Sequence, residues 1–225
     1  MFQLFATQVT DEWGTSYSLT TAGYCALIAL MLLFFIAACF FSVEKEHTQF
    51  RSKQLVFSAM AIALATVASF IKFAHLPMGG SITLFSMLFI CLIGYWYGLR
   101  SGLMAAIAYG FLQLILDPYI ISIPQMFIDY FFAFGSLGLS GLFSKSKHGL
   151  VKGFLLGVLG RYFFTFLSGI IFFASYAASY NMAVPVYSLL YNGFYLVPEA
   201  VITLILIATP PVSNALQKVK TMALA

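Results

Sequence analysis

The chain has 225 residues, of which 62% are hydrophobic and only 8% are charged, and its formal net charge is +4. Because a soluble domain carries about 25% charged residues, this composition excludes a protein with a water-facing surface on all sides. We therefore predict an integral membrane protein.

The first long apolar run lies within residues 21–42 and is longer than the h-region of a cleaved signal peptide, which has about 7–15 residues. No Lys or Arg precedes it, whereas Asp11 and Glu12 do. We expect a retained transmembrane helix whose N-terminus faces outward.

Further apolar runs follow, separated by short polar breaks. A helix needs roughly 20 residues to cross a bilayer. The expected spans cover residues 55–75, 81–98, 102–116, 123–143, 150–177 and 188–209, and Pro210–Pro211 ends the last one. The predicted fold is an all-α integral membrane bundle with seven spans.

The basic residues divide the connecting loops into two classes. The loops after the first, third and fifth spans and the C-terminal tail hold every Lys and Arg except Lys72 and Arg161. The loops on the other side, "HLPMGGS", "DPYIISIP" and "ASYNMAVPVY", hold none. The positive-inside rule therefore predicts an outer N-terminus and a cytoplasmic C-terminus.

A few polar residues fall inside the predicted spans, where a mid-helix charge costs about 2.5–3.5 kcal/mol on insertion scales. Arg161 and Glu199 lie at similar depth and could neutralise each other as an ion pair that holds the last two spans together. Asp129, near the outer side, then lacks a partner. An unpaired carboxylate at this depth is a candidate functional group.

Tyrosines gather in the same outer half. Tyr187, Tyr191 and Tyr195 are spaced i, i+4, i+8 and share one helix face, beside Asn192. An interfacial aromatic belt is the alternative interpretation of such residues. Together with Asp129, this stripe favours a flat, polar, cationic ligand held by stacking, cation–π contact and charge pairing.

Enzyme functions fit the sequence less well. The stretch "GLSG" at 138–141 would make Ser140 the nucleophile of an intramembrane hydrolase, which needs a general base in a later span. No histidine follows His148. The cysteines lack metal-ligand spacing, and we see no nucleotide motif or internal repeat. We predict no enzyme, no metal and no cofactor, but a capture module powered by a partner.

Residues 53–220 resemble the thiamine-specific substrate-binding component of energy-coupling-factor (ECF) vitamin transporters. The resemblance rests on "LPMGGSITLFSMLFI", "YGFLQLILDPYI", "IDYFFAFGSLGLSGLF", "RYFFTFLSGIIFFASYA" and "YSLLYNGFYLVPE". It implies a six-helix fold in a prokaryotic plasma membrane. It also implies that the vitamin enters from outside and is passed to a membrane coupling subunit, which two cytoplasmic ATPases drive with ATP. Residues 51–225 would be the substrate-binding domain, and residues 1–50 would add an outer N-terminus, an extra helix and a cytoplasmic linker.

The resemblance also implies a set of ligand-binding residues. They are Asp129, Tyr130, Tyr119, Tyr187, Asn192, Arg161, Thr165 and Phe173, with Glu199 either holding the helices or lining the floor. Three positions depart from the family pattern, because Asp129 replaces a usual Glu and Thr165 and Phe173 replace a usual His and Trp. The expected ligand is thiamine or a close relative, and another small vitamin or precursor is the alternative.

Alanines on the span at 55–75 predict close helix packing. Ala59 and Ala63, like Ala61 and Ala65, are small residues four positions apart, which lets a neighbouring helix approach closely in lipid. In the family such a motif contacts the coupling subunit. Packing inside the bundle is the other interpretation.

Overall fold

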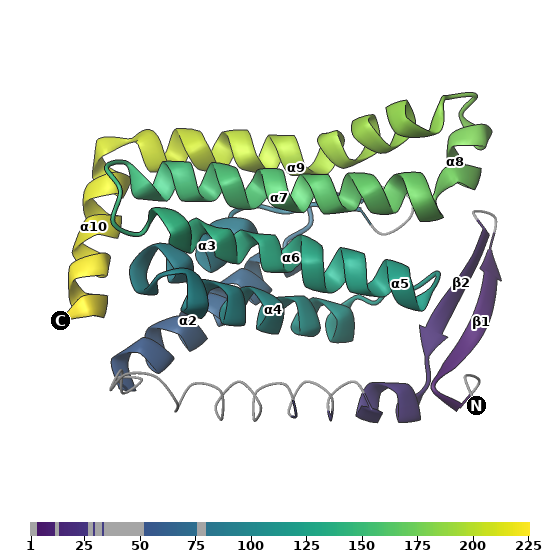
Figure 1. Cartoon of the computed structure of the whole chain (residues 1–225), viewed down its shortest axis with the longest axis horizontal. Helices are drawn as coiled ribbons and strands as arrows, with labels where there is room; N and C mark the ends of the chain where they lie inside the picture. Colours follow the sequence, from purple (N-terminus) through teal and green to yellow (C-terminus); the bar gives the residue numbers. More distant parts are fainter. Residues whose placement is uncertain (1–3, 12–13, 27–28, 30–32, 34–51, 76–79) are drawn as a thin grey trace.

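The structure is a computed structural model, and it describes residues 4–11, 14–26, 29, 33, 52–75 and 80–225. Most of the described residues form a bundle of long apolar helices (Figure 1). The main helices are α2 (Ser52–Phe70), α3 (Ser86–Tyr97), α4 (Leu99–Leu116), α7 (Gly149–Phe172) and α9 (Val184–Ala208). A further span, Ile123–Phe143, is built from α5 (Ile123–Met126), η3 (Phe127–Phe132), α6 (Ala133–Gly135) and η4 (Ser136–Phe143).

Five of these stretches are long and apolar enough to cross a membrane, and α3 is a shorter apolar helix. Each predicted span from residue 55 onward thus corresponds to a helix. Of the predicted first span, residues 21–26 are helical, and residues 27–28, 30–32 and 34–42 lie outside the described residues. The all-α membrane architecture is confirmed by helices that the apolar runs predicted.

Two predicted boundaries were wrong. The span expected at 81–98 begins with a short strand, β4 (Ser81–Ile82), which pairs with β3 (Ala74–His75). Helix α3 starts only after Phe85, whose φ of 65° is left-handed and interrupts regular structure. The span expected at 150–177 breaks at Phe173, and α8 (Ala174–Ser179) follows.

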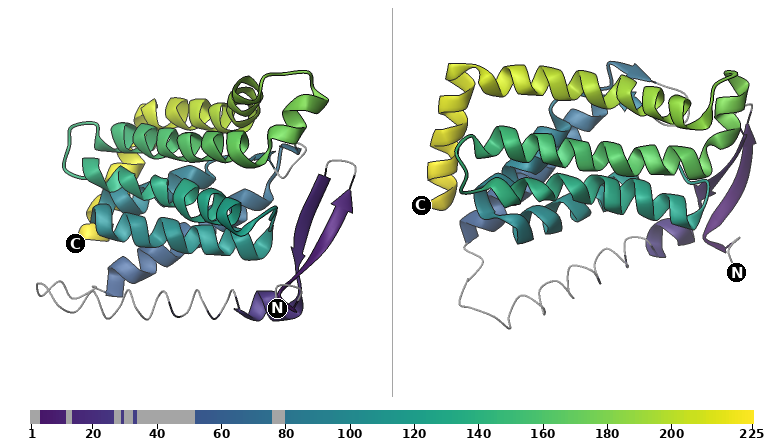
Figure 2. Two further views of the ribbon diagram at one scale, coloured as in Figure 1. Left: turned by 45° about the vertical axis from the view of Figure 1, so that its right-hand side comes forward. Right: turned by 45° about the horizontal axis from the view of Figure 1, so that its top comes forward.

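The hydrophobic pattern did not predict the secondary structure near either end of the described chain. Near the N-terminus, β1 (Ala6–Asp11) pairs antiparallel with β2 (Gly14–Leu19). After α9, α10 (Pro210–Leu224) runs across the end of the bundle (Figures 1 and 2). Its two prolines lie in the first turn, where the missing N–H groups would have no helical partner. The Pro–Pro pair therefore ends one helix and starts the next.

Helix α3 lies at the centre, with Met87 and Ile90 fully buried among residues of the neighbouring helices. Glycines allow the helices around it to approach closely. A Cβ on Gly138 would lie 2.5 Å from the backbone nitrogen of Leu103, so α4 and η4 meet backbone to backbone. Small residues of this kind are typical of helix contacts in membranes.

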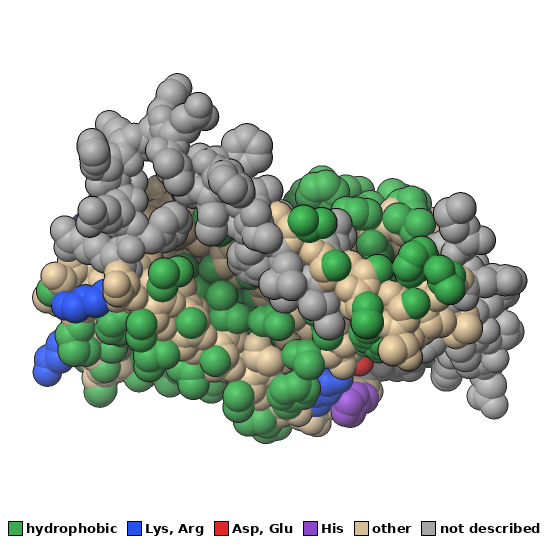
Figure 3. Space-filling view, turned by 90° about the horizontal axis from the view of Figure 1, so that it is seen from below, with side chains coloured by type: hydrophobic (Ala, Val, Ile, Leu, Met, Phe, Trp, Pro, Cys, Tyr) green, Lys and Arg blue, Asp and Glu red, His purple; other side chains and the backbone are tan. Residues whose placement is uncertain are grey.

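Much of the outer surface of the bundle is apolar. On α2, Leu55, Met60, Leu64 and Val67 are exposed. Figure 3 shows that hydrophobic side chains cover most of the described part of one long face. A surface of this kind faces lipid rather than water.

Candidate ligand site

A cavity opens at the end of the bundle where α2 and α4 end and α9 begins. Its volume is about 160 Å³, whereas one water molecule needs about 10–15 Å³, so a small organic molecule fits. It is lined by Ser69, Lys72, Gly80, Ser81, Thr83, Ser86, Tyr109, Gln113, Asp117, Tyr119, Gln125, Asp129, Tyr130, Phe134, Arg161, Thr165, Ser168, Gly169, Phe173, Tyr187, Ser188, Tyr191, Asn192 and Tyr195.

All of the predicted ligand-binding residues except Glu199 lie in this lining. They come from three regions: the segment from the end of α4 into η3, the second half of α7 with the residue that follows it, and the first half of α9. Tertiary packing thus brings together side chains that are up to 73 residues apart in sequence, as counted from Tyr119 to Asn192 (192 − 119). Their contact with a ligand stays a prediction.

Asp129 lies in η3, a stretch of π-helix. Such wide turns are rare and occur often at functional sites. The carboxylate accepts a hydrogen bond of 2.6 Å from the side-chain amide of Gln125, one turn earlier. No salt bridge to Asp129 is found among the described residues, where the ion pair that the structure shows joins Lys72 to Asp117. The carboxylate is therefore anchored by a neutral group and has no cation within salt-bridge distance among the described residues.

Aromatic rings form the wall beside Asp129. Tyr119 stacks on Phe173 with ring centroids 6.2 Å apart, and its hydroxyl lies 2.9 Å from that of Tyr176. On α9, Tyr187 stacks on Tyr191 at 5.9 Å. The i, i+4 tyrosine spacing thus places two stacked phenols on the cavity wall, as the sequence predicted.

Asn192 is 4% exposed and joins α9 to α7. Its amide donates to the backbone oxygens of Ser188, at 2.9 Å, and Thr165, at 3.2 Å. Its oxygen accepts a hydrogen bond of 2.7 Å from Tyr195. Asn192 therefore orients a cavity tyrosine and holds two helices together.

Arg161 and Glu199 do not form the predicted ion pair. The guanidinium of Arg161 lies over the ring of Phe134, 4.1 Å from the centroid. Its Nε is buried without a hydrogen-bond partner among the described residues. A ligand atom that accepts a hydrogen bond would satisfy it.

Glu199 is 3% exposed and lies outside the cavity lining. Its carboxylate accepts hydrogen bonds from Thr83 Oγ1 at 2.9 Å, Ser86 Oγ at 3.0 Å and the backbone N–H of Met87 at 3.1 Å. Of its two predicted roles, the structure favours holding the helices. Thr83 and Ser86 themselves line the cavity, so Glu199 supports the floor from below.

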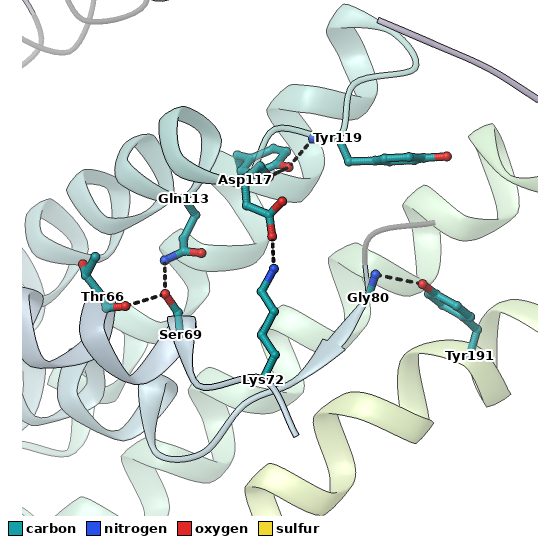
Figure 4. Close-up of polar contacts among 9 residues, drawn as sticks. Thr66, Ser69, Lys72, Gly80, Gln113, Asp117, Tyr119 and Tyr191 are labelled. Atoms are coloured by element: carbon teal, nitrogen blue, oxygen red, sulfur yellow. Dashed lines mark hydrogen bonds and ion pairs between the residues drawn. The ribbon is translucent and has the colours of Figure 1, made fainter. Parts of the chain in front are cut away.

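Polar contacts also join the rim of the cavity (Figure 4). Lys72 forms a salt bridge with Asp117, which connects the segment after α2 to the segment after α4. The backbone N–H of Gly80 donates to Tyr191 Oη at 2.9 Å.

Sequence reasoning missed several cavity residues, among them Gln125 and Ser168, which both lie beside Asp129. The i, i+4 spacing of Gln125 and Asp129 is a known side-chain pairing on helices, so this pair could have been noticed. Ser168 is 1% exposed, and its Oγ lies beside Asp129 but has no hydrogen bond of regular geometry among the described residues. Nothing in the sequence marks Ser168.

The alternative hydrolase interpretation of Ser140 is wrong. Ser140 is 0% exposed, and its Oγ donates to the backbone oxygen of Cys91 at 3.0 Å. It is not a cavity residue. Its hydroxyl and the glycines around it serve the close packing of η4 against α3. The described residues also hold no cluster of three or more metal-ligating side chains.

The structure separates the two alanine pairs of α2. Ala61 and Ala65 are buried, at 4% and 0% exposure, and pack inside the bundle. Ala59 and Ala63 are exposed. The structure therefore favours packing inside the bundle for the buried pair and leaves the exposed pair accessible to a partner.

Comparisons with known proteins identify relatives of this chain. The family described as Thiamine transporter protein matches residues 55–219. Thiamine transporter ThiT of Bacillus subtilis (strain 168) is 34% identical over 177 residues, which span 70% of this chain and 91% of that protein. Thiamine transporter ThiT of Lacticaseibacillus paracasei is 31% identical over 130 residues, which span 48% of this chain and 64% of that protein. A solved structure of ThiT from Listeria monocytogenes superposes with a TM-score of 0.57 and 25% identity, covering 70% of this chain and 94% of that one.

Proposed function

The chain belongs to the thiamine transporter protein family, and on this premise we propose that its cavity binds thiamine on the outer side of the membrane. Family membership makes the chain a multi-pass membrane transporter of the ECF substrate-binding type, and not an enzyme. The site residues, the orientation and the partner subunits are the parts that we propose here.

One observation carries the ligand assignment: the carboxylate of Asp129 lies in the same cavity as stacked aromatic rings. Thiamine joins a thiazolium cation to an aminopyrimidine ring. The carboxylate supplies the opposite charge, whose attraction is several-fold stronger in a desolvated cavity than in water. The phenol and phenyl rings offer stacking and cation–π contact to the two flat rings.

Arg161 fits the second half of such a ligand. Its buried Nε–H needs a hydrogen-bond acceptor, and the ring nitrogens of an aminopyrimidine are acceptors. The cavity therefore pairs an anionic group for the cationic ring with a donor for the neutral ring. If Asp129 and Arg161 had only a structural role, the buried Nε–H of Arg161 would have no acceptor among the described residues.

The distribution of charge supports an outward-facing cavity. Lys53 and Arg100, at the starts of α2 and α4, lie at the end opposite the cavity, as do Lys145 and Lys147 between η4 and α7. At the cavity end, Lys72 is neutralised by Asp117. Under the positive-inside rule, the basic end faces the cytoplasm. Seven spans with the N-terminus outside fit this orientation.

We further propose that the exposed face of α2 around Ala59 and Ala63 docks on an ECF coupling subunit, which two cytoplasmic ATPases drive. A close approach needs small side chains, and this pair is exposed on a helix with an apolar surface. Residues 51–225 would form the substrate-binding domain, which the family match from residue 55 supports.

Isothermal titration calorimetry on the purified full chain tests the ligand. Thiamine should bind, and thiochrome, a flat and uncharged oxidation product of thiamine, should bind far more weakly because it cannot pair with Asp129. Equal affinity for both compounds would show that the positive charge of thiamine does not contribute to binding. If thiamine gives no binding heat and a different vitamin does, that vitamin is the substrate instead.

A further inference from the structure

The side chain of Gln125, in the cavity lining, makes three hydrogen bonds. It lies in α5 and is 1% exposed. Its Oε1 accepts the backbone N–H of Ile121 at 3.0 Å. Its Nε2 donates to the backbone oxygen of Tyr119 at 3.1 Å and to Asp129 Oδ2 at 2.6 Å.

These partners determine which way the amide points. A primary amide has two N–H donors and one oxygen acceptor. Here two acceptors, from Tyr119 and Asp129, face Nε2, and one donor, from Ile121, faces Oε1. The reversed orientation would place the amide oxygen against two acceptors and its nitrogen against a donor.

The bond has a consequence for Asp129. One carboxylate oxygen, Oδ2, is occupied by Gln125. This bond sets the direction of the carboxylate, whose negative charge is shared by both oxygens and faces the cavity. The same amide holds the backbone of Tyr119, whose ring forms the stack with Phe173. One side chain thus sets the relative position of the charge and the aromatic wall.

We propose that Gln125 is a positioning residue that orients Asp129 toward the cationic ring of the ligand and keeps Tyr119 in register with it. This inference rests on the proposed function, because it takes an organic cation as the ligand. Gln125 acts through Asp129, so its effect on affinity depends on the charge of that residue.

The test is a double-mutant cycle measured with thiamine by calorimetry. Gln125→Met keeps a similar shape and removes all three hydrogen bonds. Gln125→Glu keeps an oxygen for the Ile121 N–H, and so retains that anchor of the loop, but places a second carboxylate beside Asp129. We expect Gln125→Met to weaken binding roughly 10- to 100-fold, the range for hydrogen bonds to a charged group. Gln125→Glu should bind more weakly still.

Asp129→Asn supplies the second background. Adding Gln125→Met to it should weaken binding by less than about threefold, because the charge that Gln125 orients is gone. Ser122→Ala is the matched control. It removes the side chain that caps α5 through the Gln125 backbone N–H, and should lower thermal stability but change affinity by less than about threefold.

The outcomes separate two failures. If Gln125→Met weakens binding by the same factor in both backgrounds, or not at all in the parent, the positioning role is overturned while thiamine binding stands. If the parent does not bind thiamine, the proposed function fails and this inference fails with it. If Asp129→Asn binds thiamine as tightly as the parent, thiamine binding stands, but Asp129 does not hold the ligand and the positioning role is overturned. If Gln125→Met does not fold, the cycle with Gln125→Glu decides by the same comparison.

Discussion

The carboxylate of Glu199, in α9, accepts a hydrogen bond of 3.1 Å from the backbone N–H of Met87, in the first turn of α3. The first N–H groups of a helix have no partner within it, and the preceding residue, Phe85, offers no side-chain cap. Glu199 therefore caps α3 from another helix, where a negative charge also suits the helix dipole. Its burial is explained by this bond and the two from Thr83 and Ser86.

Replacing Glu199 should reduce stability more than affinity. Glu199→Ala removes the acceptor of three buried donors, of which only the Thr83 and Ser86 hydroxyls can still bond to each other, at 3.1 Å. The free energy of unfolding should therefore fall by about 2–4 kcal/mol. Glu199→Gln keeps one acceptor oxygen and should fall between the parent and Glu199→Ala. Thermal unfolding in detergent measures the stability, and calorimetry at a temperature where the variants are folded measures binding. A fully stable Glu199→Ala that has lost thiamine binding would instead place Glu199 in the ligand site.

The charge of Asp129 should dominate ligand affinity. Asp129→Asn nearly preserves shape and should cost about 2–4 kcal/mol, the range for truncating one member of a buried charge pair, or roughly 30- to 1000-fold in affinity. Tyr187→Phe keeps the ring and removes only the hydroxyl, so it should cost about 1 kcal/mol. Calorimetric titration with thiamine gives both values. The reverse order of the two effects would show that the ligand is not held as a cation.

Ser168→Ala should affect binding without affecting stability. Its hydroxyl is buried in the cavity lining beside Asp129 and makes no hydrogen bond of regular geometry among the described residues, so its removal should cost the free protein little stability. If a ligand bonds to it, affinity should fall by about 1 kcal/mol, or roughly fivefold. Ser136→Ala is the control, because Ser136 is buried outside the cavity and bonded to Phe132. Unchanged affinity in Ser168→Ala would exclude this contact.

Two glycines test the packing behind Asp129. A Cβ on Gly110 would overlap the backbone oxygen of Tyr130, whereas one on Gly135 would meet only Ile107 Cγ1 at 3.5 Å. We expect Gly110→Ala to lower the free energy of unfolding by about 1–3 kcal/mol, as overpacking does, and to weaken binding by shifting η3. Gly135→Ala should be neutral or slightly stabilising, since Ala favours helix. Denaturation curves and thiamine titrations of both variants measure this, and identical behaviour would contradict the close contact.

The exposed alanine pair should matter for transport only. Ala63→Leu should leave thiamine binding and thermal stability unchanged but reduce thiamine uptake by cells that express the partner subunits, because the larger side chain prevents close approach. Ala65→Leu enlarges a fully buried side chain and should lower the free energy of unfolding by about 1–3 kcal/mol. Normal uptake by the Ala63→Leu variant would exclude this face as the docking site.

Several features could be predicted from the sequence because the bilayer imposes local rules on it. A spanning helix must be about 20 apolar residues long, so the runs from residue 55 onward marked the helices. Polar residues are rare at membrane depth, so Asp129, Arg161 and Asn192 were conspicuous, and the structure places all three around one cavity. The tyrosine stripe followed from the helical period alone.

Only the tertiary structure decided which polar groups pair. Arg161 and Glu199 match in charge and depth along the sequence, yet Arg161 lies over Phe134 and Glu199 caps α3. Periodicity gives the face of a helix but not the helix that it meets. Ala61 and Ala63 are alike in sequence, and packing alone buried one and exposed the other. Hydropathy is a property of each residue, whereas a hydrogen bond needs two atoms within about 3 Å of each other. That distance depends on how closely the helices approach at their glycines.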